Sequence, residues 1–135
     1  MNDTRISYNE LIGIPYDEFG DSINGTNCYN LLRMAFKKHG LYIPETNIAV
    51  CACSQASNRE IQDQALKYWT QIERPIEPCG VLIQSPNPMF SNHLGTYIGN
   101  DMMLHITQNT NSVVERLYPK FNNKILGFYQ FRSEK

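Results

Sequence analysis

The pattern of hydrophobic and polar residues changes near the middle of the chain. In the first half, apolar residues recur every three or four positions, which is the period of one face of a helix. In the second half they fall in short runs rich in β-branched and aromatic residues, separated by Pro, Gly and Asn. Helices followed by a series of strands indicate an α+β fold with an antiparallel sheet.

The first half of the chain predicts three helices. A short helix covers residues 6–13, and a second runs from about Cys28 to Lys38 and stops at Gly40. A third amphipathic helix follows, which two prolines then terminate. The apolar residues that mark this third helix are Ile61, Ala65, Leu66, Trp69 and Ile72. At that spacing, Trp69 is expected to lie in the core.

The second half of the chain predicts strands separated by turn residues. Each strand is rich in the residue types that fit a pleated, half-buried surface. The expected strands cover residues 80–85, 93–99, 102–107, 112–117 and 124–132. We therefore expect N-terminal helices packed on a central antiparallel β-sheet.

Composition indicates one domain and argues against charge-driven partners. With 135 residues, 41% of them hydrophobic, the chain can form one sizeable core, so we interpret residues 1–135 as a single domain. Twelve basic and thirteen acidic residues give a net charge of -1, which favours neither nucleic acid nor an anionic membrane as a partner. The amino terminus lacks the basic start and apolar run of a secretory signal. We therefore expect synthesis in the cytoplasm without a signal peptide.

Four cysteines raise the question of disulfides or a metal site. A chain of this size without a signal usually keeps its thiols reduced, so we expect free thiols. Cys51 and Cys53 have one residue between them, which is poor spacing for a structural zinc site. We interpret Cys51, Cys53 and Cys79 as buried, inert thiols and expect no metal or organic cofactor.

Cys28 differs from the other cysteines because it stands at the predicted start of a helix. Unpaired backbone N–H groups and the positive end of the helix dipole favour a thiolate there. The alternative is a small core residue. A thiol nucleophile also needs a base within hydrogen-bond reach and a group that orients that base.

His93 and His105 are the candidate base and orienting group for such a thiol. The turn "IGND" lies between their strands, so the two segments form a hairpin with its midpoint at Gly99. Within about one residue of register the two histidines would be cross-strand neighbours. His39 lies at the far end of the helix that begins at Cys28 and cannot reach it. The alternatives are two ordinary half-buried histidines, or a zinc site.

Four separated motifs occur in a characteristic order. "GIPYDEFG" contains Tyr16, "NGTNCYNLL" contains Cys28, "NHLGTYIGND" contains His93, and "MMLHIT" contains His105. In this order they resemble the NlpC-type cell-wall cysteine peptidases, a branch of the papain-like fold. The resemblance implies that Cys28 is the nucleophile, His93 the general base and then acid, and His105 the orienting residue. It also implies that Tyr16 lies near the oxyanion.

The residues that flank the cysteine depart from the family pattern. Family members commonly read Asp-Cys-Ser-Gly, whereas this chain reads Asn27-Cys28-Tyr29-Asn30. Asn27 and Tyr29 are the candidate substrate-binding residues, at positions where relatives that cut a free-amine stem peptide hold the ammonium group. The segments "CYNLLR", "SNHLGTYIGNDMMLH" and "KILGFYQFR" are similar to those of phage or prophage tail-associated peptidases.

The resemblance implies a cysteine endopeptidase that hydrolyses an amide bond in peptidoglycan stem peptides, between D-glutamate and the diamino acid. The implied partners are the peptide stem of bacterial peptidoglycan and other phage tail proteins. We expect the protein either to be incorporated in a phage tail or to be released to act on the cell wall. Two other hypotheses are a non-catalytic or assembly-related tail component that retains the fold, and an acyltransferase or thioesterase with the same Cys and His chemistry.

Overall fold

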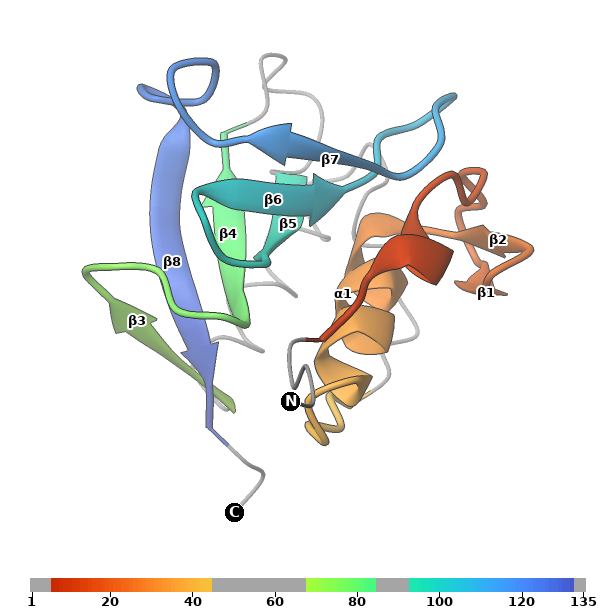
Figure 1. The fold of residues 1–135 in the computed structure, drawn as a ribbon, viewed down its shortest axis with the longest axis horizontal. Helices are drawn as coiled ribbons and strands as arrows, with labels where there is room; N and C mark the ends of the chain where they lie inside the picture. The colour runs from red at the N-terminus through yellow and green to blue at the C-terminus, as the bar shows by residue number, and fades with distance from the viewer. Residues whose placement is uncertain (1–5, 45–67, 85–92, 133–135) are drawn as a thin grey trace, which may run out of the picture.

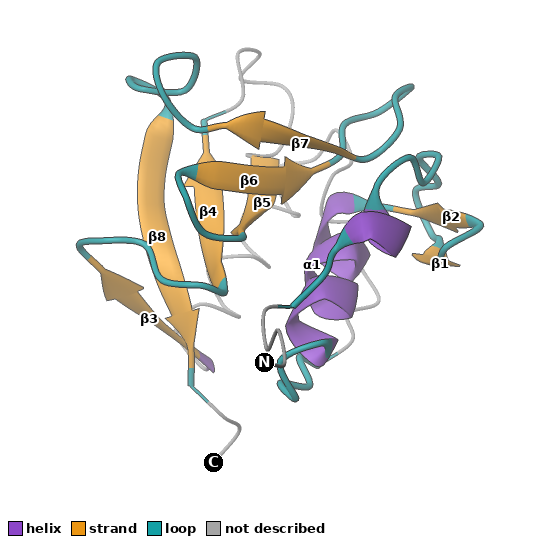
Figure 2. Ribbon diagram, viewed as in Figure 1, coloured by secondary structure: helices purple, strands orange, loops and turns teal. Residues whose placement is uncertain are grey.

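The computed structural model describes residues 6–44, 68–84 and 93–132, in which a helix packs beside a sheet (Figure 2). In chain order the elements are η1 (Asn9–Leu11), β1 (Asp21–Ser22), β2 (Gly25–Thr26), α1 (Cys28–Lys37), β3 (Trp69–Ile72), β4 (Cys79–Ile83), β5 (His93–Tyr97), β6 (Met102–His105), β7 (Val113–Arg116) and β8 (Ile125–Phe131). The predicted α+β class is confirmed.

Six of the strands form one antiparallel sheet in the order β3-β8-β4-β5-β6-β7. The strands β4 to β8 coincide with the five regions that the sequence predicts. In Figure 1, β8 returns from the end of the chain to lie between β3 and β4. Gly99, Asn100 and Asp101 all have positive φ (91°, 54° and 58°) in the turn that joins β5 to β6, and the Met102 N–H closes this turn on the Gly99 carbonyl at 2.9 Å. Positive φ at both central residues of this turn, Asn100 and Asp101, suits the right-handed twist of a hairpin.

The helix α1 forms where the sequence predicts it because its apolar residues share one face. Leu31, Leu32, Ala35 and Phe36 are all buried. With this face α1 contacts β5 and β6, and its other neighbours include β1 and η1 (Figure 1). The chain turns away at Gly40, whose φ of +75° favours glycine.

In the described part of the chain, two hydrophobic clusters form the core. The first joins α1 to the sheet and contains Cys28, Leu32, Phe36, Trp69, Leu94 and Leu104, among others. The second contains no residue of α1 and is built from the sheet and the segment after β7, including Val81, Tyr97, Met103, Phe121 and Phe128. No helix within the described ranges is both long and apolar enough to span a membrane.

The predicted helix over residues 6–13 is wrong except for the short 3-10 turn of η1. Buried Ser112 binds the backbone on both sides of Gly13: its hydroxyl donates to the Leu11 carbonyl at 2.6 Å and accepts from the Ile14 N–H at 2.8 Å. Gly13 itself has φ of +87° and donates its N–H to the Ser112 carbonyl at 2.8 Å. These long-range bonds satisfy backbone groups that a helix would have used locally.

The Ser112→Ala variant is expected to lower the free energy of unfolding by about 2 kcal/mol, because it leaves two buried backbone groups unpaired. Urea unfolding followed by circular dichroism measures the loss. The matched control is Ser22→Ala, which removes an exposed hydroxyl that accepts from the Asn24 N–H at 3.1 Å and should change stability by less than about 0.5 kcal/mol. Equal stability of Ser112→Ala and wild type would contradict the role of Ser112.

The third predicted helix is wrong at its C-terminal end, because Trp69–Ile72 form the strand β3. Pairing with β8 from Trp69↔Phe131 to Ile72↔Phe128 supplies the backbone hydrogen bonds of this segment. The predicted place of Trp69 in the core is confirmed, since its ring meets those of Phe36 and Phe131 edge-on at 5.5 and 5.3 Å. Ile61, Ala65 and Leu66 lie outside the described residues.

Candidate active site

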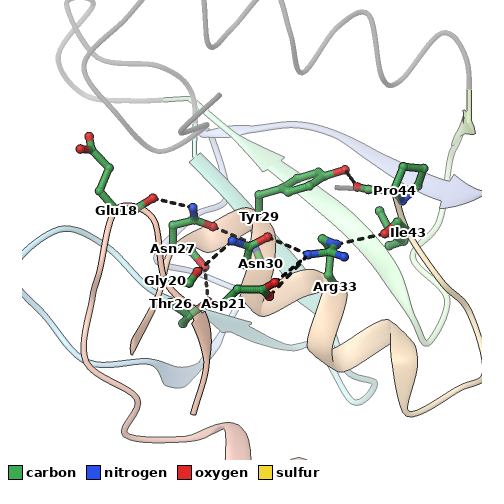
Figure 3. Close-up of polar contacts among 10 residues, drawn as sticks. All are labelled: Glu18, Gly20, Asp21, Thr26, Asn27, Tyr29, Asn30, Arg33, Ile43 and Pro44. Atoms are coloured by element: carbon green, nitrogen blue, oxygen red, sulfur yellow. Dashed lines mark hydrogen bonds and ion pairs between the residues drawn. The ribbon is translucent and has the colours of Figure 1, made fainter. Parts of the chain in front are cut away.

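Cys28 is the first residue of α1 and is almost completely buried. The preceding Asn27 caps the helix: its Oδ1 accepts from the Asn30 N–H at 2.8 Å and its Nδ2 donates to the Glu18 carbonyl at 2.7 Å (Figure 3). The cap therefore uses the N–H of Asn30 rather than that of Cys28. This arrangement places the sulfur at the positive end of the helix dipole, as the sequence predicts.

Cys28 is disulfide-bonded in this structure. The expectation that the thiols are free is therefore wrong for Cys28. It holds for Cys79, which is a free, fully buried thiol whose pKa is raised to about 11 by burial. A thiol with so high a pKa is inert near neutral pH, as the sequence predicts for this residue. Cys51 and Cys53 lie outside the described residues.

The structure brings His93 and His105 together. His93 Nε2 lies 2.8 Å from His105 Nδ1, and the two ring centroids are 5.0 Å apart. The register is Tyr97↔Met103, so the hairpin is centred on Asn100 rather than Gly99. His105 therefore lies opposite Gly95 and meets His93 diagonally on the same face of the sheet. The two histidines are thus close to each other, as predicted. They are diagonal neighbours, however, whereas a midpoint at Gly99 predicts that they lie directly opposite each other.

Glu115, on the next strand, extends the pair and is not among the residues that the sequence predicts for the site. His105 Nε2 lies 2.5 Å from Glu115 Oε2, and Lys120 Nζ lies 2.7 Å from Glu115 Oε1. The only signal in the sequence is a carboxylate at an alternate position of the predicted strand 112–117. That position becomes informative only once the register His105↔Val113 is known.

The electrostatics of this chain of residues favour neutral histidines and an ionised carboxylate. Burial lowers the pKa of His93 and of His105, and in both cases Glu115 opposes the shift. The hydrogen bond from Lys120 is the largest cause that lowers the pKa of Glu115, and the bond from His105 also lowers it. The carboxylate can therefore only accept a hydrogen bond, and the histidines are available as bases.

Tyr16 lies beside the segment that leads into Cys28. Its backbone bridges to Thr26, and its ring packs against the first cluster, which also contains Cys28. Its hydroxyl is buried and has no hydrogen-bond partner among the described residues. Burial raises the pKa of Tyr16. Tyr16 thus presents a protonated hydroxyl that could donate to a bound oxygen.

The candidate substrate-binding residues Asn27 and Tyr29 both have partners in the protein itself. The amide of Asn27 is used by the cap, and the Tyr29 hydroxyl donates to the Pro44 carbonyl at 2.5 Å (Figure 3). Both residues are buried. Their contact with substrate stays a prediction.

Cys28 belongs to the same hydrophobic cluster as residues adjacent in sequence to the two histidines. Cys28 shares the first cluster with Leu94 and Leu104, which are the sequence neighbours of His93 and His105. Within the described residues there is no hydrogen bond between Cys28 and either histidine, and Cys28 is engaged in its disulfide. The catalytic roles of Cys28, His93, His105 and Tyr16 therefore stay predictions.

In the part of the chain that the structure describes, no group of three or more His, Cys, Asp or Glu side chains is placed to hold a metal ion. The histidines of the zinc alternative bond to each other and to Glu115 instead. A helix that begins at a cysteine and packs on a sheet with paired histidines on adjacent strands is a papain-like α+β arrangement.

The sequence places this arrangement in a particular family. The model of the NlpC/P60 family matches residues 13–127, which includes every candidate site residue named above. The chain belongs to the NlpC/P60 family. No curated protein matches the chain.

Solved structures share the fold at low sequence identity. An NLP/P60-family protein from Staphylococcus aureus, described as similar to lipoprotein, is 16% identical with a TM-score of 0.59 over 93% of this chain and 39% of its own. NlpC1 from Trichomonas vaginalis is 17% identical with a TM-score of 0.62 over 93% of this chain and 41% of its own. The NlpC/p60 domain of the peptidoglycan hydrolase SagA is 12% identical with a TM-score of 0.58 over 90% of this chain and 91% of that domain. The chain thus spans about two fifths of the first two proteins and nearly all of the SagA domain.

Proposed function

We propose that this protein is a cysteine endopeptidase that hydrolyses an amide bond in the peptide stem of bacterial peptidoglycan, between D-glutamate and the diamino acid. The hydrogen-bonded His93 and His105 beside a helix that begins at Cys28 are the observation that carries the proposal. Membership of the NlpC/P60 family, and the fold shared with a domain of a peptidoglycan hydrolase, support the substrate class.

In the proposed mechanism, reduced Cys28 gives its proton to His93 Nδ1, because the other ring nitrogen of His93 is engaged by His105. The thiolate then attacks the scissile carbonyl. The Cys28 backbone N–H and the Tyr16 hydroxyl donate to the oxyanion. His93 returns the proton to the leaving amine as the C–N bond breaks, which leaves a thioester on Cys28. Water, deprotonated by His93, hydrolyses the thioester and restores the thiol.

The proposed setting is a phage or prophage tail, in which other tail proteins would be partners. The resemblance of "CYNLLR" and "KILGFYQFR" to tail-associated peptidases supports it. The competing hypothesis is a tail component that retains the fold without cutting peptidoglycan. It is favoured by the engagement of Asn27 and Tyr29 within the protein, because these residues occupy the positions where relatives hold a free amine.

Digestion of purified peptidoglycan, with mass spectrometry of the released fragments, tests the proposal. After reduction, wild type should release fragments that identify the bond, whereas Cys28→Ala should release none, because it has no nucleophile. Cys79→Ala is the matched control: it removes a buried thiol of raised pKa and should digest like wild type. Fragments from Cys28→Ala, or none from reduced wild type, would contradict the proposal, and the second result would favour the tail component.

A further inference from the structure

His93 and His105 belong to a hydrogen-bonded row of three residues. Its third member is the carboxylate of Glu115 on the neighbouring strand, which bonds to His105. Three strands in sequence order, β5, β6 and β7, each supply one member: His93, His105 and Glu115. His93 Nε2 lies 2.8 Å from His105 Nδ1, and the other ring nitrogen of His105, Nε2, lies 2.5 Å from Glu115 Oε2. The side chain of His105 is only 7% exposed, so water does not compete strongly for its ring nitrogens.

The geometry points to Glu115 as the positioning residue that sets the proton positions on both histidines, and so leaves the lone pair of neutral His93 on Nδ1. The inference rests on the proposed function for its catalytic meaning, whereas the proton positions themselves are a property of the folded chain. Glu115 is not assigned contact with the substrate.

The proton positions follow from donor and acceptor capacity alone. An ionised carboxylate only accepts, so His105 Nε2 must carry the hydrogen that it donates to Glu115 Oε2. A neutral imidazole has one donor, so His105 Nδ1 is then an acceptor. His93 Nε2 must therefore donate to it, which leaves the lone pair of neutral His93 on Nδ1. Without the carboxylate, the opposite set of tautomers would satisfy the bond between the two histidines equally well.

Glu115 is itself held in place. Lys120 binds Oε1 while His105 binds Oε2, so the two carboxylate oxygens have different partners and the group cannot rotate without losing one. The ring of Phe121 meets the His105 ring edge-on at 5.7 Å and limits its rotation as well. Among the described residues, the charged or titratable groups around His105 are thus His93, Glu115 and Lys120.

The same carboxylate stabilises positive charge when His93 takes a proton. Glu115 favours the protonated forms of both histidines, whereas burial disfavours them. Loss of the carboxylate charge should make the His93 imidazolium less stable. Because a thiolate at Cys28 forms as His93 becomes protonated, the thiolate should then require a higher pH.

The test compares Glu115→Gln with wild type, both fully reduced. Nitrogen-15 NMR of the histidine rings should show, in wild type, hydrogen on Nε2 and none on Nδ1 of both residues. The amide of Glu115→Gln can donate as well as accept, so it should give a mixture of tautomers. The pH midpoint for iodoacetamide alkylation of Cys28 should move upward, and peptidoglycan hydrolysis should fall by about tenfold. Glu115→Asp, which keeps the charge, should recover part of each change.

Glu10→Gln is the matched control, because Glu10 also pairs with a lysine, Lys38, but is bonded to no histidine. It should leave the NMR signals and the alkylation profile unchanged. If Glu115→Gln matches wild type in its NMR signals, its alkylation midpoint and its hydrolysis, the inference is overturned and the proposed function still stands. If wild type digests nothing while Glu115→Gln still changes the tautomers and the alkylation midpoint, the proposed function fails and the positioning role stands. Thermal unfolding of each variant verifies that it is folded.

Discussion

His93→Ala is expected to lower the rate of peptidoglycan hydrolysis by about two to four orders of magnitude, which is what a positioned acid and base contributes. His93 would accept the thiol proton before attack and return it to the leaving amine, so its loss affects both halves of the reaction. Burial lowers the pKa of His93, which leaves the ring neutral near pH 7 but also disfavours its protonated form, and Glu115 opposes that shift. The measurement is kcat/KM on soluble stem-peptide fragments of peptidoglycan.

The chain offers a control for this substitution in its third histidine. His39 lies beyond the C-terminal end of α1, with its Nε2 2.7 Å from the Tyr8 hydroxyl. His39→Ala removes an imidazole of equal size that is remote from the helix start, so it should leave kcat/KM within about twofold of wild type. An active His93→Ala, or an equally inactive His39→Ala, would refute the assignment of His93 as base.

Wild type that retains the Cys28 disulfide is expected to hydrolyse peptidoglycan no faster than Cys28→Ala. A sulfur in a disulfide has no thiolate to attack a carbonyl and no proton to give to His93. Treatment with a thiol reductant should therefore switch the activity on. Hydrolysis is measured before and after reduction, and intact-mass spectrometry after iodoacetamide treatment reports the state of the cysteines.

The alkylation pattern provides the control for this second experiment. Cys28 should be labelled only after reduction, whereas Cys79 should stay unlabelled in both samples while the protein is folded, because burial raises its pKa to about 11. Full hydrolysis by a sample whose mass shows the intact disulfide would show that Cys28 is not the nucleophile.

The sequence predicts the parts of this structure that depend on local pattern. The strands β4 to β8 follow from runs of β-branched and aromatic residues, and α1 follows from its single apolar face. The sequence predicts a helix where β3 forms, because apolar residues in "WTQI" continue a helical spacing, whereas pairing with β8 decides the conformation of this segment. That pairing joins segments about sixty residues apart, so no local pattern reports it.

The sequence predicts those parts of the site whose residues lie close together along the chain, and it does not predict those that depend on pairing between more distant segments. His93 and His105 are joined by one tight turn, so their proximity could be expected from the spacing. Glu115 depends on a second register, across the longer connection from β6 to β7, and was missed. The disulfide of Cys28 depends on three-dimensional proximity, which composition does not report.

The turn at Asn100 and Asp101 makes the arrangement of the histidines sensitive to a single inserted residue. Side chains alternate between the two faces of a strand, so a hairpin that slips by one residue turns every side chain of β6 over. Leu104 would then take the place of His105 opposite Gly95, and the proton path from His93 to Glu115 would be cut. An insertion of one residue in this exposed turn is therefore expected to break the hydrogen bonds that join His93, His105 and Glu115, although all three residues are retained.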